Sequence, residues 1–258
     1  MTDQDYEYRG LLASTWDLFR GDTSNWEDKF FYEKIIQRYG QPVLDVGCGT
    51  GRLILDFLSQ DVDIDGLDVS PEMLAICRRK AQSLGLSPNL YEQGMEVLAL
   101  PRRYCTIIVP SLSFQLVVDT SSAVQAMNRF YEHLVNGGAL VIPFRIFWEE
   151  GDPVELEWKL LGEETRPSDG AKIRHWAYAL FDGEEQVQFT EDRYEIFLND
   201  QVVKSEHHKR SPALRWYTQS QALALYQSAG FNNIRIYSGF EDKPASTTDN
   251  IFTIIGTK

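Results

Sequence analysis

A glycine-rich segment near the start of the chain has the residue types and spacing of a ligand-binding loop. It reads VLDVGCGTGR over residues 43–52, a short apolar β-rich run followed by a turn with Gly47, Gly49 and Gly51. Glycines let a ligand approach the backbone closely, and the first turn of a following helix presents unpaired N–H groups. The segment therefore predicts a binding site for a small ligand.

Two carboxylates and one arginine narrow the kind of ligand. Arg52 stands where the dinucleotide fingerprint G-x-G-x-x-G has its last glycine, which disfavours nicotinamide and flavin cofactors. Asp45 lies at the end of the β-rich run, where it suits a cationic ligand group better than a pyrophosphate. Asp68 follows 23 residues later, at the position from which Rossmann-like folds bind ribose hydroxyls. Helix capping at this point is better explained by Ser70 with Pro71.

A third polar group follows a later apolar run, in the sequence VPSLSFQ over residues 109–115. Ser113 and Gln115 are candidates for orienting a second reactant, and Ser111 is a candidate for the ligand site. The alternative is that Ser111 and Ser113 end a strand through local hydrogen bonds.

The elements that must position these residues follow an α/β pattern. Short β-rich runs alternate with amphipathic helical stretches over residues 42–147, which predicts βαβ units and a parallel sheet. The predicted strands are Val43–Val46, Asp63–Asp68, Asn89–Gln93, Cys105–Val109 and Ala139–Phe144. The predicted helices are Gly51–Gln60, Pro71–Leu84 and Ser121–Val135, the last stopped by residues 136–138, Asn-Gly-Gly.

The sequence pattern changes between Val154 and about Arg215, where polar and apolar residues alternate with a period of two. Turns at residues 168–170, 182–183 and 199–200 complete the pattern of an antiparallel meander. The α/β pattern then resumes with a helix over Ser220–Ala229 and strands over Asn232–Tyr237 and Asn250–Gly256. We predict a single domain over residues 1–258, with a helical cap at 1–41, a Rossmann-like core at 42–147 and 216–258, and an inserted antiparallel sheet at 148–215.

These motifs together resemble the successive motifs of class I S-adenosylmethionine-dependent methyltransferases. The resemblance rests on residues 45–51, on Asp68 with residues 70–74, on Gly94-Met95 and on residues 134–138. It implies S-adenosyl-L-methionine as the cofactor and a seven-stranded sheet in the order 3-2-1-4-5-7-6, with the last strand antiparallel. It also implies residue roles: the three glycines along the methionine part, Asp68 on ribose, and Val69, Met73, Gly94 and Met95 around adenine.

The N-terminal segment is similar to the cap of small-molecule N-methyltransferases of the glycine N-methyltransferase and amino-sugar N,N-dimethyltransferase type. In those enzymes an N-terminal helix closes over the methionine end with aromatic rings, which implies Trp16 and Tyr32 here. Packing of these rings on the sheet is an equal alternative. The chain departs from many relatives at Met95, where they carry an aspartate, so adenine is expected to rely on backbone N–H groups and apolar contact.

Methyl transfer from a sulfonium is an in-line displacement that needs alignment and exclusion of water, without a metal or a covalent intermediate. We expect a small-molecule acceptor, methylated at nitrogen rather than oxygen, because acidic walls and aromatic rings favour an amine. His175, His207 and His208 are candidate bases or simply exposed residues. Two alternatives stay open: an S-adenosylmethionine-binding regulator or assembly partner without turnover, and a nicotinamide oxidoreductase.

The composition of the sequence limits the classes of partner that the protein can bind. The net charge of -13 repels phosphate backbones and anionic lipid, and residues 149–200 contribute most of it, with 15 acidic and 5 basic side chains. We therefore expect no nucleic-acid partner, and no apolar run approaches the roughly 20 residues of a membrane helix. An acidic N-terminus unlike a signal peptide and three cysteines without metal spacing favour a cytoplasmic protein. The inserted sheet is expected to cover the substrate or to form a homodimer contact.

Overall fold

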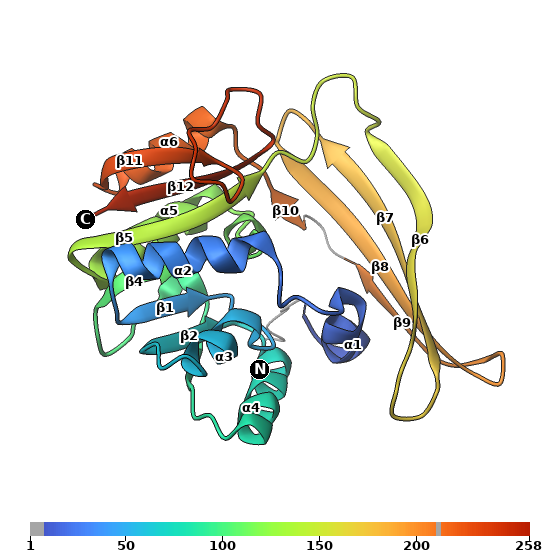
Figure 1. The fold of residues 1–258 in the computed structure, drawn as a ribbon. Coiled ribbons are helices and arrows are strands. Elements are labelled where there is room, and N and C mark those ends of the chain that lie inside the picture. The colour runs from blue at the N-terminus through green and yellow to red at the C-terminus, as the bar shows by residue number, and fades with distance from the viewer. Residues whose placement is uncertain (1–7, 210–212) are drawn as a thin grey trace.

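The computed structural model describes residues 8–209 and 213–258, so parts of the predicted cap and inserted sheet, residues 1–7 and 210–212, lie outside the described residues. Its central layer is a seven-stranded sheet in the order β11-β12-β5-β4-β1-β2-β3 (Figure 1). The strands are β1 (Val43–Val46), β2 (Ile64–Asp68), β3 (Asn89–Glu92), β4 (Tyr104–Ile108), β5 (Leu134–Arg145), β11 (Asn232–Ser238) and β12 (Ile251–Thr257). Strands β1 to β5 pair in parallel, whereas β12 is antiparallel to both of its neighbours. Counted within this sheet the order is 3-2-1-4-5-7-6, which confirms the predicted fold.

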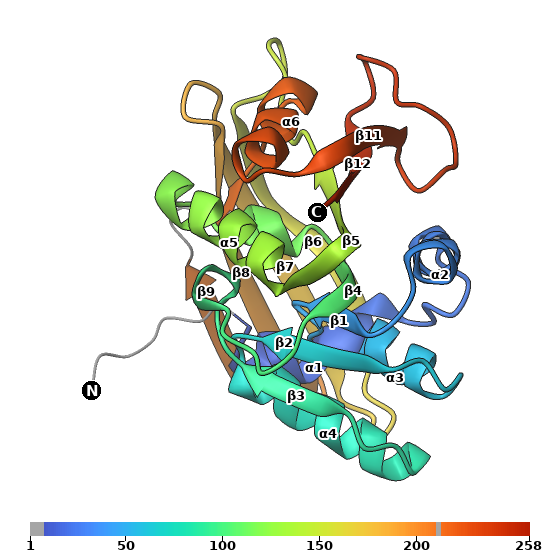
Figure 2. The same ribbon diagram turned by 90° about the vertical axis from the view of Figure 1, so that its left-hand side faces the viewer.

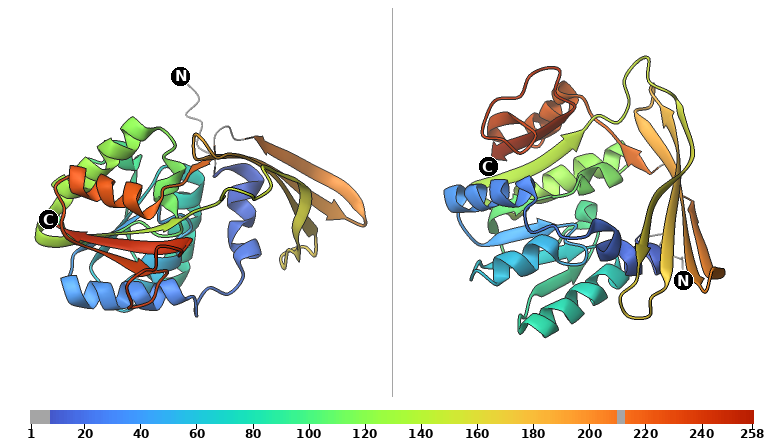
Figure 3. Two further views of the ribbon diagram at one scale, coloured as in Figure 1. Left: turned by 90° about the horizontal axis from the view of Figure 1, so that it is seen from above. Right: turned by 45° about the vertical axis from the view of Figure 1, so that its right-hand side comes forward.

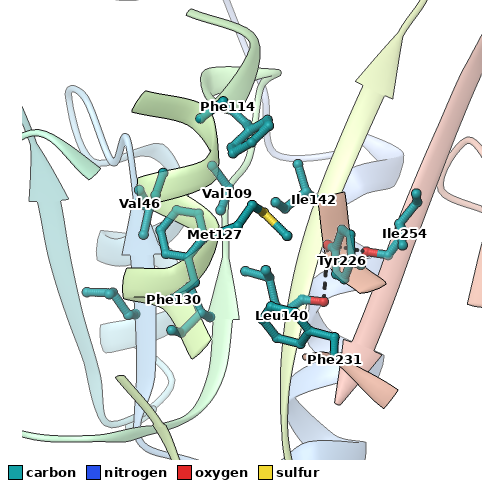
Figure 4. Packing of buried hydrophobic residues seen from close by; sticks show 14 of the residues in the cluster. Val46, Val109, Phe114, Met127, Phe130, Leu140, Ile142, Tyr226, Phe231 and Ile254 are labelled. Carbon is teal, nitrogen blue, oxygen red and sulfur yellow. Dashed lines mark hydrogen bonds between the residues drawn. The ribbon is translucent and has the colours of Figure 1, made fainter. Parts of the chain in front are cut away.

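Helices pack on both faces of this sheet (Figure 2). The helices α5 (Thr120–His133) and α6 (Gln219–Ser228) share one apolar core with the sheet, and α2 (Glu27–Tyr39), α3 (Arg52–Leu58) and α4 (Pro71–Leu84) share the other. Figure 4 shows part of the first core, where Met127 and Phe130 of α5 pack near Val109 and Ile142. The sheet is therefore buried on both faces, as a parallel sheet requires.

A second, five-stranded antiparallel sheet stands beside the core. It consists of β6 (Glu155–Thr165), β7 (Lys172–Asp182), β8 (Val187–Leu198), β9 (Gln201–Lys209) and β10 (Leu214–Arg215). Its strands pair as the predicted meander, and the helix α1 (Gly10–Arg20) lies between it and the core (Figure 3). Leu11 and Leu12 of α1 pack with Ile173 and Ile196 of this sheet and with Met73 of α4. The inserted sheet therefore holds α1 against the core.

The predicted end of α5 is wrong. The helix stops at His133, and the Asn-Gly-Gly segment at residues 136–138 lies inside β5, where the pairing with β4 shifts register. Gly137 has a φ of 80°, and its N–H donates to the Lys258 carbonyl at 3.0 Å. Glycines that accept positive φ serve a helix end and a β-bulge equally well, so the sequence did not distinguish them.

Two findings concern the described part of the chain only. Within residues 8–209 and 213–258, no helix is long and apolar enough to cross a bilayer. The same residues bring no three His, Cys, Asp or Glu side chains together as metal ligands.

Candidate active site

A cavity of about 540 Å³ lies at the carboxyl ends of β4, β1, β2 and β3. Pro110, Gly47, Val69 and Gly94, which follow these four strands, line it from the core, and Trp16 lines it from α1. Parallel α/β sheets bind ligands at this edge, beside the point where the strand order reverses, here between β1 and β4. The volume lies within the usual range of small-molecule sites, roughly 300–1,000 Å³.

Gly47 allows the loop after β1 to pass close to the short 3₁₀ helix η2 (Ser113–Leu116). Its φ is 75°, and a Cβ there would lie 2.5 Å from Ser113 Oγ and 2.7 Å from Ser113 Cβ. Any side chain at this position would meet both a strained backbone and a clash. The glycine therefore brings the β1 and β4 ends of the cavity together.

Asp68 ties the ends of β1 and β2 together. Its Oδ2 accepts the Gly49 N–H and its Oδ1 accepts the Ser70 N–H, both at 2.8 Å. Burial raises the pKa of Asp68, although the N–H groups of Ser70 and Gly49 oppose that shift. Ser70 Oγ accepts the Met73 N–H at 3.1 Å, which confirms Ser70 as the cap of α4.

Asp45 is a buried carboxylate with unused hydrogen-bonding capacity. The residue is 1% exposed and lines the cavity, and its Oδ1 has no hydrogen-bond partner among the described residues. Burial raises the pKa of Asp45 to about 7, against the opposing charge of Arg52. Burying a charge is costly unless an opposite charge accompanies it. Asp45 therefore provides a seat for a cationic ligand group.

Two arginines and two tryptophans stack beside the cavity. The Arg20 guanidinium lies 4.6 Å from the ring centre of Trp16 and 5.1 Å from that of Trp26. The Arg52 guanidinium lies 5.0 Å from the Trp26 ring. This ladder links α1, the segment before α2 and the start of α3 through cation–π contacts.

The two arginines differ in how their charge is balanced. Arg52 forms a bidentate pair with Asp28, at 2.9 and 2.5 Å. Arg20 has no carboxylate within salt-bridge distance in the described part of the chain, and burial together with Arg52 lowers its pKa. Both guanidinium groups donate to Ser111 Oγ, at 3.3 and 3.5 Å. Arg20 thus lines the cavity without a salt bridge of its own among these residues.

Most of the residues predicted for the site line this one cavity. They are Trp16, Asp45, Gly47, Gly49, Asp68, Val69, Met73, Gly94, Met95, Ser111 and Ser113. They come from α1, the loops after β1, β2, β3 and β4, and the first turn of α4.

Three predicted site residues, Tyr32, Gly51 and Gln115, are outside the cavity lining. Tyr32 is fully buried, with its ring 6.1 Å from that of Phe240, so it packs in the core of α2. Gly51 is the N-cap residue of α3 and has a φ of 92°. Gln115 is also buried, and its amide donates to the carbonyls of Arg145 and Arg215, which joins β5 to β10.

Sequence reasoning missed several lining residues, including Tyr8, Arg20 and Glu96. No spacing or motif singles them out, because α1 and the short turn after β3 reach the cavity only through tertiary packing. The histidines lie elsewhere: His175, His207 and His208 are all on the inserted sheet, and His175 Nε2 lies 2.7 Å from Asp192 Oδ1.

Comparison with known proteins fits this geometry. The family model described as a methyltransferase domain matches residues 43–138, which include the glycine-rich loop, Asp68 and the end of β4. A dTDP-3-amino-3,6-dideoxy-alpha-D-glucopyranose N,N-dimethyltransferase of Streptomyces fradiae is 23% identical over 233 residues, 88% of this chain and 86% of the relative. Residues 43–138 thus form a methyltransferase domain, and the protein has the fold of S-adenosylmethionine-dependent methyltransferases.

Two solved structures share the fold of the methyltransferase over almost its whole length. An S-adenosylmethionine-dependent methyltransferase from Clostridium acetobutylicum ATCC 824 superposes with a TM-score of 0.76 at 16% identity, covering 95% of this chain and 96% of that one. The sugar N-methyltransferase of Streptoalloteichus sp ATCC 53650 superposes with a TM-score of 0.72 at 20% identity, covering 100% and 98%. Both alignments therefore include the inserted sheet as well as the core.

The cavity fits S-adenosylmethionine, the cofactor that the sequence motifs imply. The unpartnered Asp45 Oδ1 suits the ammonium group at the amino-acid end of the cofactor. The close passage at Gly47 leaves backbone, with no Cβ, facing the same end. Arg20 lines the same cavity and carries the charge opposite to that of an ionised Asp45.

Proposed function

We propose that the methyltransferase transfers the methyl group to a nitrogen atom of a small-molecule acceptor. The observation that carries the proposal is the β4 end of the cavity, where Ser111 and Ser113 face α1, with Trp16 and Arg20 on the opposite wall. This space suits a small acceptor, and the net charge of -13 disfavours a nucleic acid. The names of the Streptomyces and Streptoalloteichus proteins support nitrogen as the accepting atom.

The geometry of the cavity supports the following arrangement of the cofactor. We place the ammonium group of the cofactor on Asp45 and its carboxylate on Arg20. Asp68 takes the ribose hydroxyls, with Gly47 and Gly49 along the methionine part. The adenine lies beyond Asp68, on the wall formed by the apolar side chains that follow β2 and β3, Val69, Met73 and Met95.

When bound, the cofactor supplies an electrophilic methyl group on a sulfonium. The protein then has to aim a nucleophile at it and exclude water. Ser113 Oγ donates to the Pro110 carbonyl at 2.7 Å, so it has only lone pairs left for an acceptor. Those lone pairs accept the N–H of an amine and orient its nitrogen lone pair.

The charges at this end of the cavity favour an uncharged amine. Arg20 and Arg52 both reach Ser111, and a second cation beside them is repelled. His175, His207 and His208 do not line the cavity, so no imidazole takes the amine proton there. We therefore propose that the acceptor binds as the free base.

A panel of acceptors tests this proposal. The purified protein is incubated with S-adenosylmethionine and matched amines, amino sugars, alcohols and phenols, and products are detected by mass spectrometry. We expect N-methyl products, with a rate that rises with pH up to the pKa of the amine. Methylation confined to hydroxyl groups, or a rate independent of the amine pKa, would contradict the proposal.

We also propose that the chain forms a homodimer through the outer face of the inserted sheet. Side chains alternate along β7, so Trp176 and Tyr178 lie on the face opposite Ile173, which packs toward α1. Trp158 of β6 lies 6.0 Å from the Tyr178 ring, and Arg193 stacks on it at 5.5 Å. Trp158 is 42% exposed, which supports an apolar patch that a second copy covers.

A further inference from the structure

A second cavity, with a volume of about 590 Å³, lies at one end of the inserted sheet. Its walls come from the turn between β7 and β8, from the adjoining ends of these strands, and from the segment 146–154 that connects β5 to β6 (Figure 1). It shares no lining residue with the cavity of the candidate active site. A ligand of the second cavity would therefore bind apart from the cofactor.

Trp148 lies on one wall of the second cavity and is held against the turn between β7 and β8. Its indole N–H donates to the Asp152 carbonyl at 3.1 Å. A Cβ on Gly183 would lie 2.9 Å from both Cε3 and Cη2 of the Trp148 ring, so the ring lies here because position 183 has no side chain. The Phe181 N–H donates to the Val154 carbonyl at 2.8 Å, which joins the end of the segment to β7. The aromatic wall is thus positioned by backbone contacts.

Apolar side chains of β7 and β8 form another part of the lining. Leu180 and Phe189 are paired across the two strands, so both lie on one face of the sheet. This is the outer face, because Ile173 of β7 packs toward α1 and alternate side chains point to opposite faces. In the described part of the chain, no Lys or Arg stacks on Trp148 or Phe189. These rings are therefore free to contact a ligand.

Three carboxylates, those of Glu150, Asp182 and Glu184, line the same cavity. None of them lies within salt-bridge distance of a Lys, Arg or His of the residues that the structure describes. Asp182 Oδ1 accepts the N–H groups of Glu184 and Glu185, at 3.0 and 2.9 Å, which fixes this carboxylate on the turn. All three belong to the acidic segment 149–200, whose charge has no role at the candidate active site.

Aromatic rings and carboxylates attract the same class of ligand. The face of a tryptophan or phenylalanine ring attracts a cation, and unpaired carboxylates attract it through their charge. A bound metal ion would need several of these groups to converge, and the described residues contain no such group of three. An organic cation needs no such convergence, and its alkyl groups gain from contact with Leu180 and Val154.

We propose that the second cavity binds a small organic cation of the alkylammonium class. Its alkyl groups contact Trp148 and Phe189, and the three carboxylates balance its charge. The site is independent of the proposed function, because neither the cofactor nor the acceptor occupies it. A basic side chain of a second copy of the chain is the competing occupant, since the cavity lies on the same face as the patch proposed for the homodimer.

The test follows the backbone amide of Gly183 by NMR while tetramethylammonium chloride is added at constant ionic strength. tert-Butanol, which is uncharged and similar in size, is the matched probe. We expect a saturable shift with tetramethylammonium at millimolar concentrations, and none with tert-butanol. Trp148→Leu should weaken binding about 3- to 30-fold, the range of a cation–π contact, whereas Trp148→Phe retains most of it.

A pair of double variants tests the carboxylates. Glu150→Gln with Glu184→Gln should weaken tetramethylammonium binding about 3- to 30-fold. Glu157→Gln with Glu164→Gln removes the same charge from exposed positions of β6 outside the cavity, and should leave binding unchanged. Equal weakening in the two double variants would show that only the overall charge matters, and would overturn the inference.

Three further results would contradict the site. An equal shift with tert-butanol would show an apolar pocket without preference for a cation, and the absence of a saturable shift would show no site at all. Binding that is lost where the chain dimerises and restored in Trp158→Glu would show that a second copy fills the cavity. Failure to bind S-adenosylhomocysteine would overturn the cofactor seat proposed above and leave this inference standing.

Discussion

Asp45 is the residue at which stability and ligand binding oppose each other. Its carboxylate is 1% exposed, and one of its oxygens has no partner among the described residues. In the protein without ligand, ionising such a group costs free energy, which is why its pKa rises to about 7. A bound ammonium group would compensate for this cost, so the unfavourable burial serves recognition.

The first prediction concerns Asp45→Asn. The pKa of Asp45 is raised in the fold from 3.8 to about 7, so the unfolded chain loses this proton at lower pH than the folded one. The carboxylate therefore lowers stability increasingly as pH rises from about 4 to 7. Without ligand, Asp45→Asn should have a free energy of unfolding about 2–4 kcal/mol higher at pH 8, measured by urea denaturation.

The pH dependence of this gain in stability distinguishes removal of a buried charge from better packing of the introduced amide. The gain should shrink as pH falls from 7 and be small near pH 4, where Asp45 is protonated in the folded wild type and about half protonated in the unfolded chain. A gain of equal size at pH 4 and pH 8 would show that the charge of Asp45 is not its source.

At the scale of elements, α1 is the wall that closes the cavity, and polar contacts hold it on three sides. Asp17 accepts the Thr50 hydroxyl at 2.6 Å, which connects α1 to the glycine-rich loop, and it pairs with Lys80 at 2.9 Å. The helix N-terminus donates to Glu72 of α4 and to Glu206 of β9. The position of α1 over the cavity thus depends on contacts with the core and with the inserted sheet.

The second prediction tests the Thr50–Asp17 contact. Thr50→Val keeps the shape of a side chain that is 2% exposed but removes the hydroxyl donor to Asp17. We expect S-adenosylhomocysteine affinity to fall about 3- to 10-fold and amide exchange in α1 to accelerate. Thr15→Val is the matched control, because its hydroxyl bonds within α1 to the Leu11 carbonyl. Equal effects in the two variants would refute a specific role for the contact.

Some elements and site residues could be predicted from the sequence, and others could not. Local signals predicted the bounds of β1 and α4 to the residue, because a short apolar run before a glycine-rich turn and a Ser-Pro helix start are both encoded locally. The glycine loop and Asp68 were recognisable for the same reason. Gln115 was not, because its amide joins carbonyls 30 and 100 residues away. Arg20 and Glu96 reach the cavity only through the packing of α1 and of the 3₁₀ turn η1 (Met95–Val97).

At the scale of the whole molecule, the inserted sheet acts on the site through α1. None of the residues that line the cavity of the candidate active site comes from β6 to β10, although residues 149–200, which include β6, β7 and β8, carry most of the net charge. Its acidic side chains therefore do not form the cavity wall that the composition led us to expect. The inner face of the sheet supports α1, and we propose that its outer face binds a second copy of the chain.

The third prediction concerns that outer face. Trp158→Glu should convert the proposed homodimer into a monomer, measured by light scattering after gel filtration, because a charge in an apolar contact is costly. Leu84→Glu changes a 63% exposed side chain at the end of α4 and should leave the dimer intact. A wild-type monomer at all concentrations, or a Trp158→Glu dimer, would rule out this interface.

The most direct test of the central claim is calorimetric titration of the wild-type protein with S-adenosylhomocysteine, with NADH and NADPH as controls, at pH 6 and pH 8. The account predicts binding of the homocysteine nucleoside alone, stronger at pH 8 because Asp45 is then ionised, and loss of that pH dependence in Asp45→Asn. No binding at either pH, or preference for a nicotinamide nucleotide, would contradict the cofactor seat proposed for this cavity.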